Sequence, residues 1–109
     1  MKGDIVFVRF PYTDMTIAKP RPALVLHEEK DEVVLAYISS RVPVVPSDTD
    51  ALVLRRDSSF EATGLKRDSV IKLNVLTTLK KWFIEGLFGE VDSTLKIEIN
   101  AKLASCYRL

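Results

Sequence analysis

The chain has 109 residues, of which 47% are hydrophobic and 28% are charged, and these proportions are typical of one globular domain. Sixteen Lys and Arg residues against fifteen Asp and Glu residues leave a net charge of +1, so a nucleic-acid-binding role would need a local basic patch. The single cysteine, Cys106, excludes an internal disulfide bond and a Cys-x-x-Cys metal site. No export signal is seen and no apolar run approaches the ~20 residues of a membrane span. We therefore expect one cytoplasmic domain over residues 1–109, without a membrane partner.

The first part of the chain is predicted to form three strands. Residues 3–10 are a short run of β-branched and aromatic residues that Pro11 ends. Residues 22–28 and 33–40 are similar apolar runs. The charged turn between these two runs predicts a β-hairpin.

The middle of the chain is expected to alternate irregular and extended segments. Residues 41–50 hold two prolines and several turn-forming residues, which indicates an irregular connection. The residues that follow predict a strand at 51–56, a polar loop at 57–68, a strand at 69–74 and, within 78–91, a strand, a bend and a second short strand.

The last segment has apolar residues at helical spacing, and Asp92 or Ser93 can cap the helix. The spacings of four, four and three place the apolar residues on one stripe. These residues are Leu95, Ile99, Leu103 and Cys106. Short strands followed by one helix predict a mainly β fold, either a small antiparallel barrel or a curled sheet, with the helix packed on it.

Several common catalytic motifs are missing from the sequence. His27 is the single histidine, so two histidines cannot act as acid and base within one chain, and no His-rich or Cys-rich metal site can be assembled. The glycine-rich loops that bind nucleotides and the Gly-x-Ser-x-Gly turn of esterases do not occur. Nucleotide hydrolysis, dinucleotide redox chemistry and serine-esterase chemistry are therefore disfavoured.

Arg21 is unusual because it lies between Pro20 and Pro22, immediately before a predicted strand. A residue that precedes proline is biased to extended backbone, so the side chain leaves a comparatively stiff platform. Arginine carries a permanent charge and a planar fork of donors that suits phosphate oxygens. Taken alone, such a residue is usually a solvated surface arginine; the alternative is that it stabilises a negatively charged transition state.

Four stretches of the chain are informative together. They are GDIVFVRFPYTD at residues 3–14, KPRPALVL at 19–26, AYISS at 36–40 and KRDSVIKLNVLTTLKK at 66–81. In this order they resemble the MazF/PemK family of toxin endoribonucleases. In that family a Gly-Asp start, a loop, an Arg-Pro-x-x-Val-like strand, a strand with a catalytic hydroxyl and an Asp-Ser-Val-Ile segment follow one another. The likeness spans most of the chain.

The resemblance implies a small SH3-like antiparallel barrel of the CcdB/MazF type. Such a barrel would form a homodimer, bind single-stranded RNA in a groove at the dimer interface and cleave it with no metal and no cofactor. The RNA 2′-hydroxyl would attack the adjacent phosphodiester and leave a 2′,3′-cyclic phosphate and a 5′-hydroxyl. Arg21 matches the family's essential arginine, which would neutralise charge on the nonbridging oxygens. Ser39 falls where the family has a phosphate-orienting threonine, and Ser40 is the alternative if the register differs by one.

Further residues are expected to contact RNA. Some family members carry an arginine and an aspartate where this chain has Lys72 and Asn74. Lys72 could supply charge to the phosphate or be simply solvated, and an asparagine cannot accept a proton, so the general base stays unassigned. Three residues of the loop before Arg21 are expected to line the groove or move over it. The full set expected to bind RNA is Tyr12, Thr13, Asp14, Lys19, Ser40, Lys72 and Asn74.

The resemblance also implies a protein partner. The chain would be the toxin of a type II pair, inhibited by a cognate antitoxin whose disordered tail folds across the groove and displaces RNA. Two alternatives stay open. A toxin of the same fold could poison DNA gyrase through its terminal helix, or a degenerate module could hold RNA or antitoxin without cutting.

Overall fold

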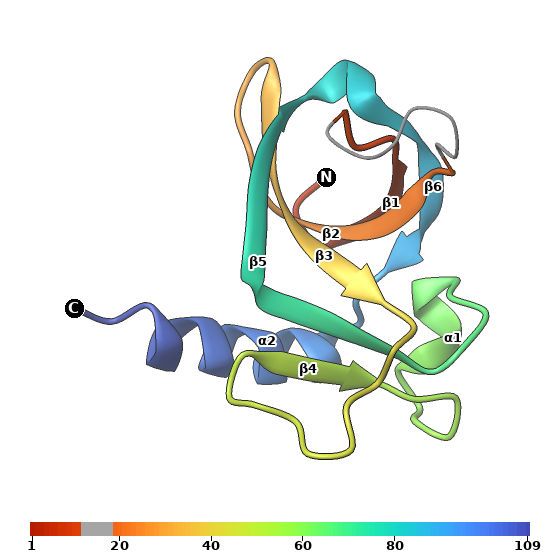
Figure 1. Ribbon diagram of the computed structural model, residues 1–109, viewed down its shortest axis with the longest axis vertical. Coiled ribbons are helices and arrows are strands. Elements are labelled where there is room, and N and C mark those ends of the chain that lie inside the picture. The colour runs from red at the N-terminus through yellow and green to blue at the C-terminus, as the bar shows by residue number, and fades with distance from the viewer. Residues whose placement is uncertain (12–18) are drawn as a thin grey trace.

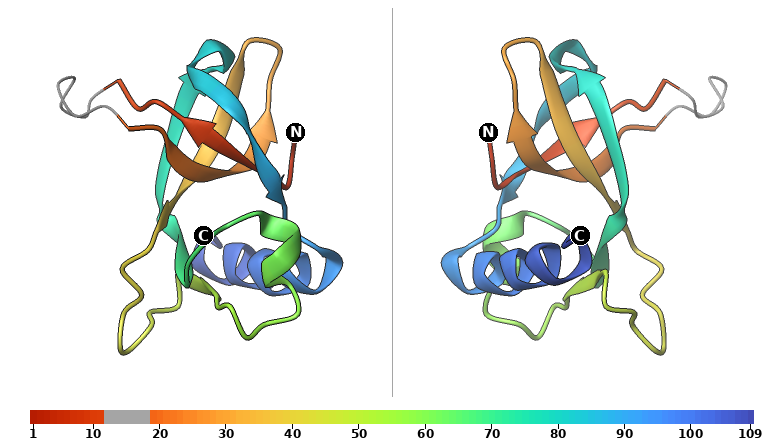
Figure 2. Two further views of the ribbon diagram at one scale, coloured as in Figure 1. Left: turned by 90° about the vertical axis from the view of Figure 1, so that its right-hand side faces the viewer. Right: turned by 90° about the vertical axis from the view of Figure 1, so that its left-hand side faces the viewer.

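The structure is a computed structural model that describes residues 1–11 and 19–109. Short connections join β2 to β3 and β6 to α2, and a longer irregular segment leads from β3 into β4 (Figure 1 and Figure 2). The elements are β1 (Asp4–Val8), β2 (Arg21–Glu28), β3 (Glu32–Ser39), β4 (Asp50–Val53), α1 (Phe60–Thr63), β5 (Ser69–Lys80), a 3-10 helix (Lys81–Phe83), β6 (Ile84–Glu90) and α2 (Ser93–Cys106).

The described strands form one antiparallel sheet in the order β4-β5-β3-β2-β1-β6. The sheet curls so that β1, β2, β3, β5 and β6 surround a common interior, while α2 lies beneath it beside β4 (Figure 1). β4 and β6 are the two edges and do not pair with each other, so hydrogen bonds do not close the barrel. This confirms the predicted mainly β fold with a terminal helix, in its curled-sheet form.

The structure differs most from the prediction at β5, at β4 and in the loop between them. β5 continues to Lys80 instead of ending at Asn74, because β3 pairs with it along its whole length across one register shift. β4 ends at Val53, where the chain turns. The predicted polar loop at 57–68 contains the short helix α1, which Gly64 ends in a left-handed conformation with φ of 72°. A helix of four residues is too short to leave a periodic pattern in the sequence.

Two hydrophobic clusters pack on the two faces of the sheet, because successive residues of a strand point to opposite sides. Ile5 belongs to the first cluster and the next residue, Val6, to the second. Leu95 and Ile99 of α2 pack on the first cluster, as the helical stripe predicts. Cys106, at the end of this stripe, is only half-buried. None of the helices described is both long and apolar enough to cross a membrane.

α2 begins with the side-chain cap that the sequence predicts. The Asp92 carboxylate accepts a hydrogen bond from the backbone N–H of Leu95 at 2.9 Å and another from the Ser59 hydroxyl at 2.7 Å. Both bonds favour the charged carboxylate, the Leu95 bond most, and lower the pKa of Asp92 below its ordinary value. Because Ser59 also precedes α1, this contact ties the start of α2 to the start of α1.

The stability of the fold should fall in acid partly through Asp92. Since its folded-state pKa is lowered, the charged carboxylate contributes stability that is fully present above its unfolded-state pKa of about 3.9 and is lost as the pH falls through the folded-state value. Asp92→Asn keeps a capping oxygen and removes the titration. In circular-dichroism melts, the variant should lose less of its melting temperature than wild type between about pH 6 and about pH 3. Parallel losses in the two proteins would contradict this role.

Candidate functional site

The pairing of β2 with β3 brings Arg21 and Ser39 to neighbouring positions. Ala23 on β2 lies opposite Tyr37 on the antiparallel strand β3. Arg21 precedes Ala23 by two residues and Ser39 follows Tyr37 by two, so both lie toward the same end of the strand pair. Residues two apart on a strand share a face of the sheet. Arg21, Ser39 and Tyr37 therefore extend the face that carries the second hydrophobic cluster beyond the end of that cluster.

These three residues line a groove with a volume of about 750 Å³. One side of the groove is built by β2 and β3, and the other by the connection between α1 and β5. Among the described residues that line it, five are Lys or Arg and none is Asp, Glu or His. The lining residues are Lys19, Arg21, Pro22, Tyr37, Ile38, Ser39, Ser40, Arg41, Leu65, Lys66, Arg67, Ser69 and Phe88.

The Arg21 guanidinium is available to a ligand. Its side chain is exposed at the start of β2, and within residues 1–11 and 19–109 it has no hydrogen bond or ion pair. On its other side β2 pairs with β1, with Val8 opposite Arg21 and Phe7 opposite Pro22. The first residues of β2 are therefore held by the sheet, and Arg21 lines the groove.

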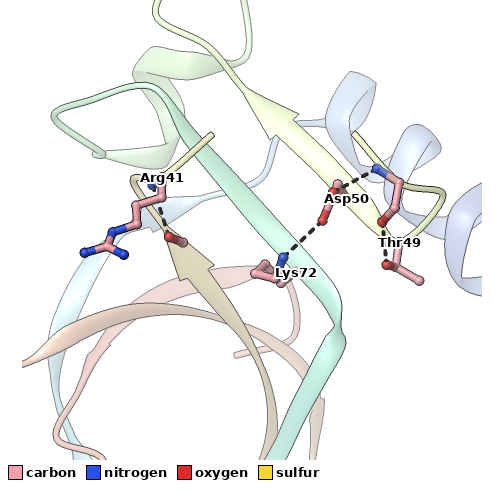
Figure 3. Close-up of polar contacts among 6 residues, drawn as sticks. Arg41, Thr49, Asp50 and Lys72 are labelled. Carbon is pink, nitrogen blue, oxygen red and sulfur yellow. Dashed lines mark hydrogen bonds and ion pairs between the residues drawn. The ribbon is translucent and has the colours of Figure 1, made fainter. Parts of the chain in front are cut away.

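The Ser39 hydroxyl is oriented by the backbone that follows it. Its oxygen accepts a hydrogen bond from the backbone N–H of Arg41 at 3.1 Å (Figure 3). A hydroxyl has one donor and two acceptor positions, so this bond uses an acceptor and leaves the O–H free to donate. Ser39 is thus suited to donate a hydrogen bond to an anionic oxygen.

Lys72 contacts a buried carboxylate instead of lining the groove. Its Nζ lies 3.5 Å from Oδ1 of Asp50, whose Oδ2 accepts from the backbone N–H of Ser47 at 2.9 Å. Figure 3 shows Lys72 directed to Asp50 and the Arg41 guanidinium directed away from this pair. The Ser47 bond, more than the charge of Lys72, lowers the pKa of Asp50. Asp50 is therefore the charged partner of Lys72 at neutral pH.

The other residues predicted to bind RNA are found in different places. Lys19 and Ser40 line the groove. Asn74 is exposed on β5 and is not among the groove-lining residues. The predictions for Tyr12, Thr13 and Asp14 fall outside the described residues.

Sequence reasoning missed several residues of the groove, namely Tyr37, Arg41, Lys66 and Arg67. The basic residues at 66–67 belong to a stretch of the second half of the chain in which Lys and Arg are common. Their distance along the sequence from Arg21 gave no sign that they share a groove with it. Tyr37 lies in an apolar strand, and this pattern gives no sign of a site residue.

Two other features of the described residues were compared with the groove, namely possible metal ligands and a second hollow. No group of three or more His, Cys, Asp or Glu side chains that could hold a metal ion occurs in the described part of the chain. A second hollow of about 390 Å³ lies between the end of β4 and the start of α2 and includes Arg56 and Glu98. It contains none of the predicted site residues.

Comparison with known proteins gives a family match and close structural likenesses. The family model described as "PemK-like, MazF-like toxin of type II toxin-antitoxin system" matches residues 1–107. No curated protein matches the chain.

Three solved structures illustrate the structural likeness. Mycobacterium tuberculosis toxin MazF-mt6 is 17% identical with a TM-score of 0.73, and the match covers 95% of each chain. An endoribonuclease in complex with its cognate antitoxin, from a mycobacterial species, is 17% identical with a TM-score of 0.72, covering 96% of this chain and 91% of that one. MazF from Deinococcus radiodurans is 18% identical with a TM-score of 0.68, covering 95% and 92%. At these identities the structures establish a shared fold.

Proposed function

Because the chain belongs to the family of PemK-like, MazF-like toxins of type II toxin-antitoxin systems, we propose that it is an endoribonuclease that cleaves single-stranded RNA. The groove between β2, β3 and the α1–β5 connection is the proposed active site. The observation that supports this most is the chemistry of the groove lining. Arg21 and Ser39 lie there with four further Lys and Arg residues, and no Asp or Glu is among the described lining residues. Such a surface suits a phosphodiester chain, whose charge dominates binding to proteins.

The proposed reaction needs no covalent enzyme intermediate. The RNA 2′-oxygen attacks the adjacent phosphorus, the bond from phosphorus to the 5′-oxygen breaks, and the products are a 2′,3′-cyclic phosphate and a 5′-hydroxyl. Negative charge grows on the nonbridging oxygens during this step. The Arg21 guanidinium neutralises that charge with a planar pair of donors, and the Ser39 hydroxyl donates a third hydrogen bond.

The remaining cations of the groove have a binding role in this proposal. Lys19, Arg41, Lys66 and Arg67 would contact phosphates on either side of the one that reacts. Such contacts hold the strand in place and carry little information about the bases. Sequence preference then comes from how the exposed bases fit the groove.

The proposed partners follow from the family. Related structures include an endoribonuclease with its cognate antitoxin and the MazE-MazF complex of Deinococcus radiodurans. We infer that this chain is inhibited by a cognate antitoxin whose tail folds across the groove, that it works as a homodimer, and that it acts in the cytoplasm. Exposed apolar side chains such as Trp82, 75% exposed, and Leu87, 63% exposed, are available for these protein contacts.

The function is tested with single-stranded RNA in EDTA and with chemical identification of the product ends. The wild-type protein should cleave RNA in EDTA and leave a 2′,3′-cyclic phosphate and a 5′-hydroxyl. A matched RNA with one 2′-deoxynucleotide at the cleaved position should resist cleavage there and nowhere else, because the attacking hydroxyl is missing.

Other outcomes would contradict parts of this proposal. Ends with a 3′-hydroxyl and a 5′-phosphate, or loss of activity in EDTA, would rule out metal-independent attack by the 2′-hydroxyl. Binding of RNA without cleavage would identify a degenerate binding module. Inhibition of DNA gyrase by a protein that leaves RNA intact would identify the gyrase-directed alternative.

A further inference from the structure

We propose that the Tyr37 hydroxyl is the general acid that protonates the 5′-oxygen as it leaves; this inference rests on the proposed ribonuclease function. The cyclising reaction needs such a group, because a ribose 5′-oxygen leaves poorly as a free alkoxide. The described residues that line the groove include no histidine or carboxyl group to supply a proton. Tyrosine is one of the side chains that act as general acids in enzymes.

The sheet places Tyr37 beside the two residues assigned to the phosphate. Tyr37 precedes Ser39 by two residues on β3, so both side chains leave the same face of the sheet. It lies opposite Ala23 on β2, which makes it a diagonal neighbour of Arg21. Diagonal neighbours on paired strands are close enough for long side chains to meet, at about 7–8 Å between their backbones.

The phenol oxygen of Tyr37 is open to solvent. The Tyr37 ring is half-buried and packs against the second hydrophobic cluster, with an edge-on contact to Phe10 at 6.2 Å between ring centroids. Its hydroxyl has no hydrogen-bond partner among the described residues. Every buried side-chain oxygen or nitrogen in that part of the chain has a partner, so an unpartnered phenol oxygen must be reached by solvent. Because Tyr37 also lines the groove, we infer that its polar end opens there.

In the proposed step the leaving 5′-oxygen takes its proton from the Tyr37 phenol. As the bond from the 2′-oxygen to phosphorus forms and the bond from phosphorus to the 5′-oxygen breaks, the electron pair of the broken bond passes to the 5′-oxygen. This oxygen takes the phenol proton and becomes a 5′-hydroxyl. The 2′-hydroxyl proton passes to water, and solvent then returns a proton to the phenolate.

Tyr37→Phe removes the hydroxyl and keeps the packed ring. On ordinary RNA the variant should lose about a hundred- to ten-thousand-fold in kcat with little change in KM. The decisive substrate carries sulfur in place of the bridging 5′-oxygen at the cleaved bond, because a thiolate leaves without needing a proton. On this substrate Tyr37→Phe and wild type should cleave at equal rates. Arg21→Ala should be slow on both substrates, since charge on the nonbridging oxygens develops with either leaving group.

The experiment separates failure of the general-acid role from failure of the ribonuclease function. A Tyr37→Phe protein that cleaves RNA as fast as wild type, or that loses the same factor on both substrates, would overturn the general-acid role while leaving the ribonuclease function in place. A wild-type protein inert on both substrates would overturn the function and the inference with it. A thermal melt of Tyr37→Phe that matches wild type controls for a change in fold.

Discussion

Replacing Arg21 with alanine is expected to lower kcat for RNA cleavage about a hundred- to a thousand-fold, the effect typical of removing one preorganised donor to a developing oxyanion. The guanidinium is exposed in a cationic groove and has no partner among the described residues, so its loss leaves no buried group unpaired. The fold should therefore be preserved, with a melting temperature close to that of wild type. Single-turnover cleavage of a short RNA in EDTA measures the effect.

Two further variants make the Arg21 result specific. Arg21→Lys keeps the charge and loses the planar fork, so it should recover only part of the rate. Arg56→Ala removes an exposed arginine outside the groove and should cleave as wild type does. Equal activity in Arg21→Ala and wild type would show that the cleavage comes from a contaminating nuclease or from another site.

Gly64→Ala is expected to cause the largest loss of stability among single substitutions at exposed or half-buried positions. Gly64 has a φ of 72°, and a Cβ there would lie 2.1 Å from the backbone oxygen of Phe88 on β6. The left-handed conformation and the clash with backbone together cost about 2–5 kcal/mol. A domain of this size would then melt at a temperature lower by roughly 10 °C or more.

Gly86→Ala is the matched control for this clash. A Cβ at Gly86 would meet only the ring of Phe7, at 3.3 Å, and no positive φ is involved. Its melting temperature should fall much less, as thermal unfolding followed by circular dichroism would show. A Gly64→Ala protein as stable as Gly86→Ala would mean that α1 and β6 can move apart at little cost.

The strands and the terminal helix could be predicted from the sequence because each carries a local pattern. β1, β2 and β3 are short apolar runs bounded by turn residues, and α2 has an apolar stripe after a capping aspartate. The prolines beside Arg21 are equally local, so its place at the start of a strand could also be predicted. Local patterns of this kind specify elements well and their long-range packing poorly.

The groove could be predicted only in part, because one of its walls depends on contacts between distant residues. Lys66 and Arg67 reach it only because the end of α1 packs against the backbone of β6, where Gly64 and Gly89 allow close approach. No periodic pattern announces that contact. The position of Lys72 depends likewise on the pairing of β4 with β5, which sets Asp50 opposite Lys72 and gives its ammonium group an anionic partner.

The two walls of the groove differ in how freely they can change. Arg21, Tyr37 and Ser39 stand on paired strands, where a shift of one residue would turn every side chain to the other face. Lys66 and Arg67 stand on a short exposed connection, and such segments tolerate substitution well. On the proposed function, substitutions in this connection would therefore change how tightly the groove holds RNA, while Arg21, Tyr37 and Ser39 keep their places on the sheet.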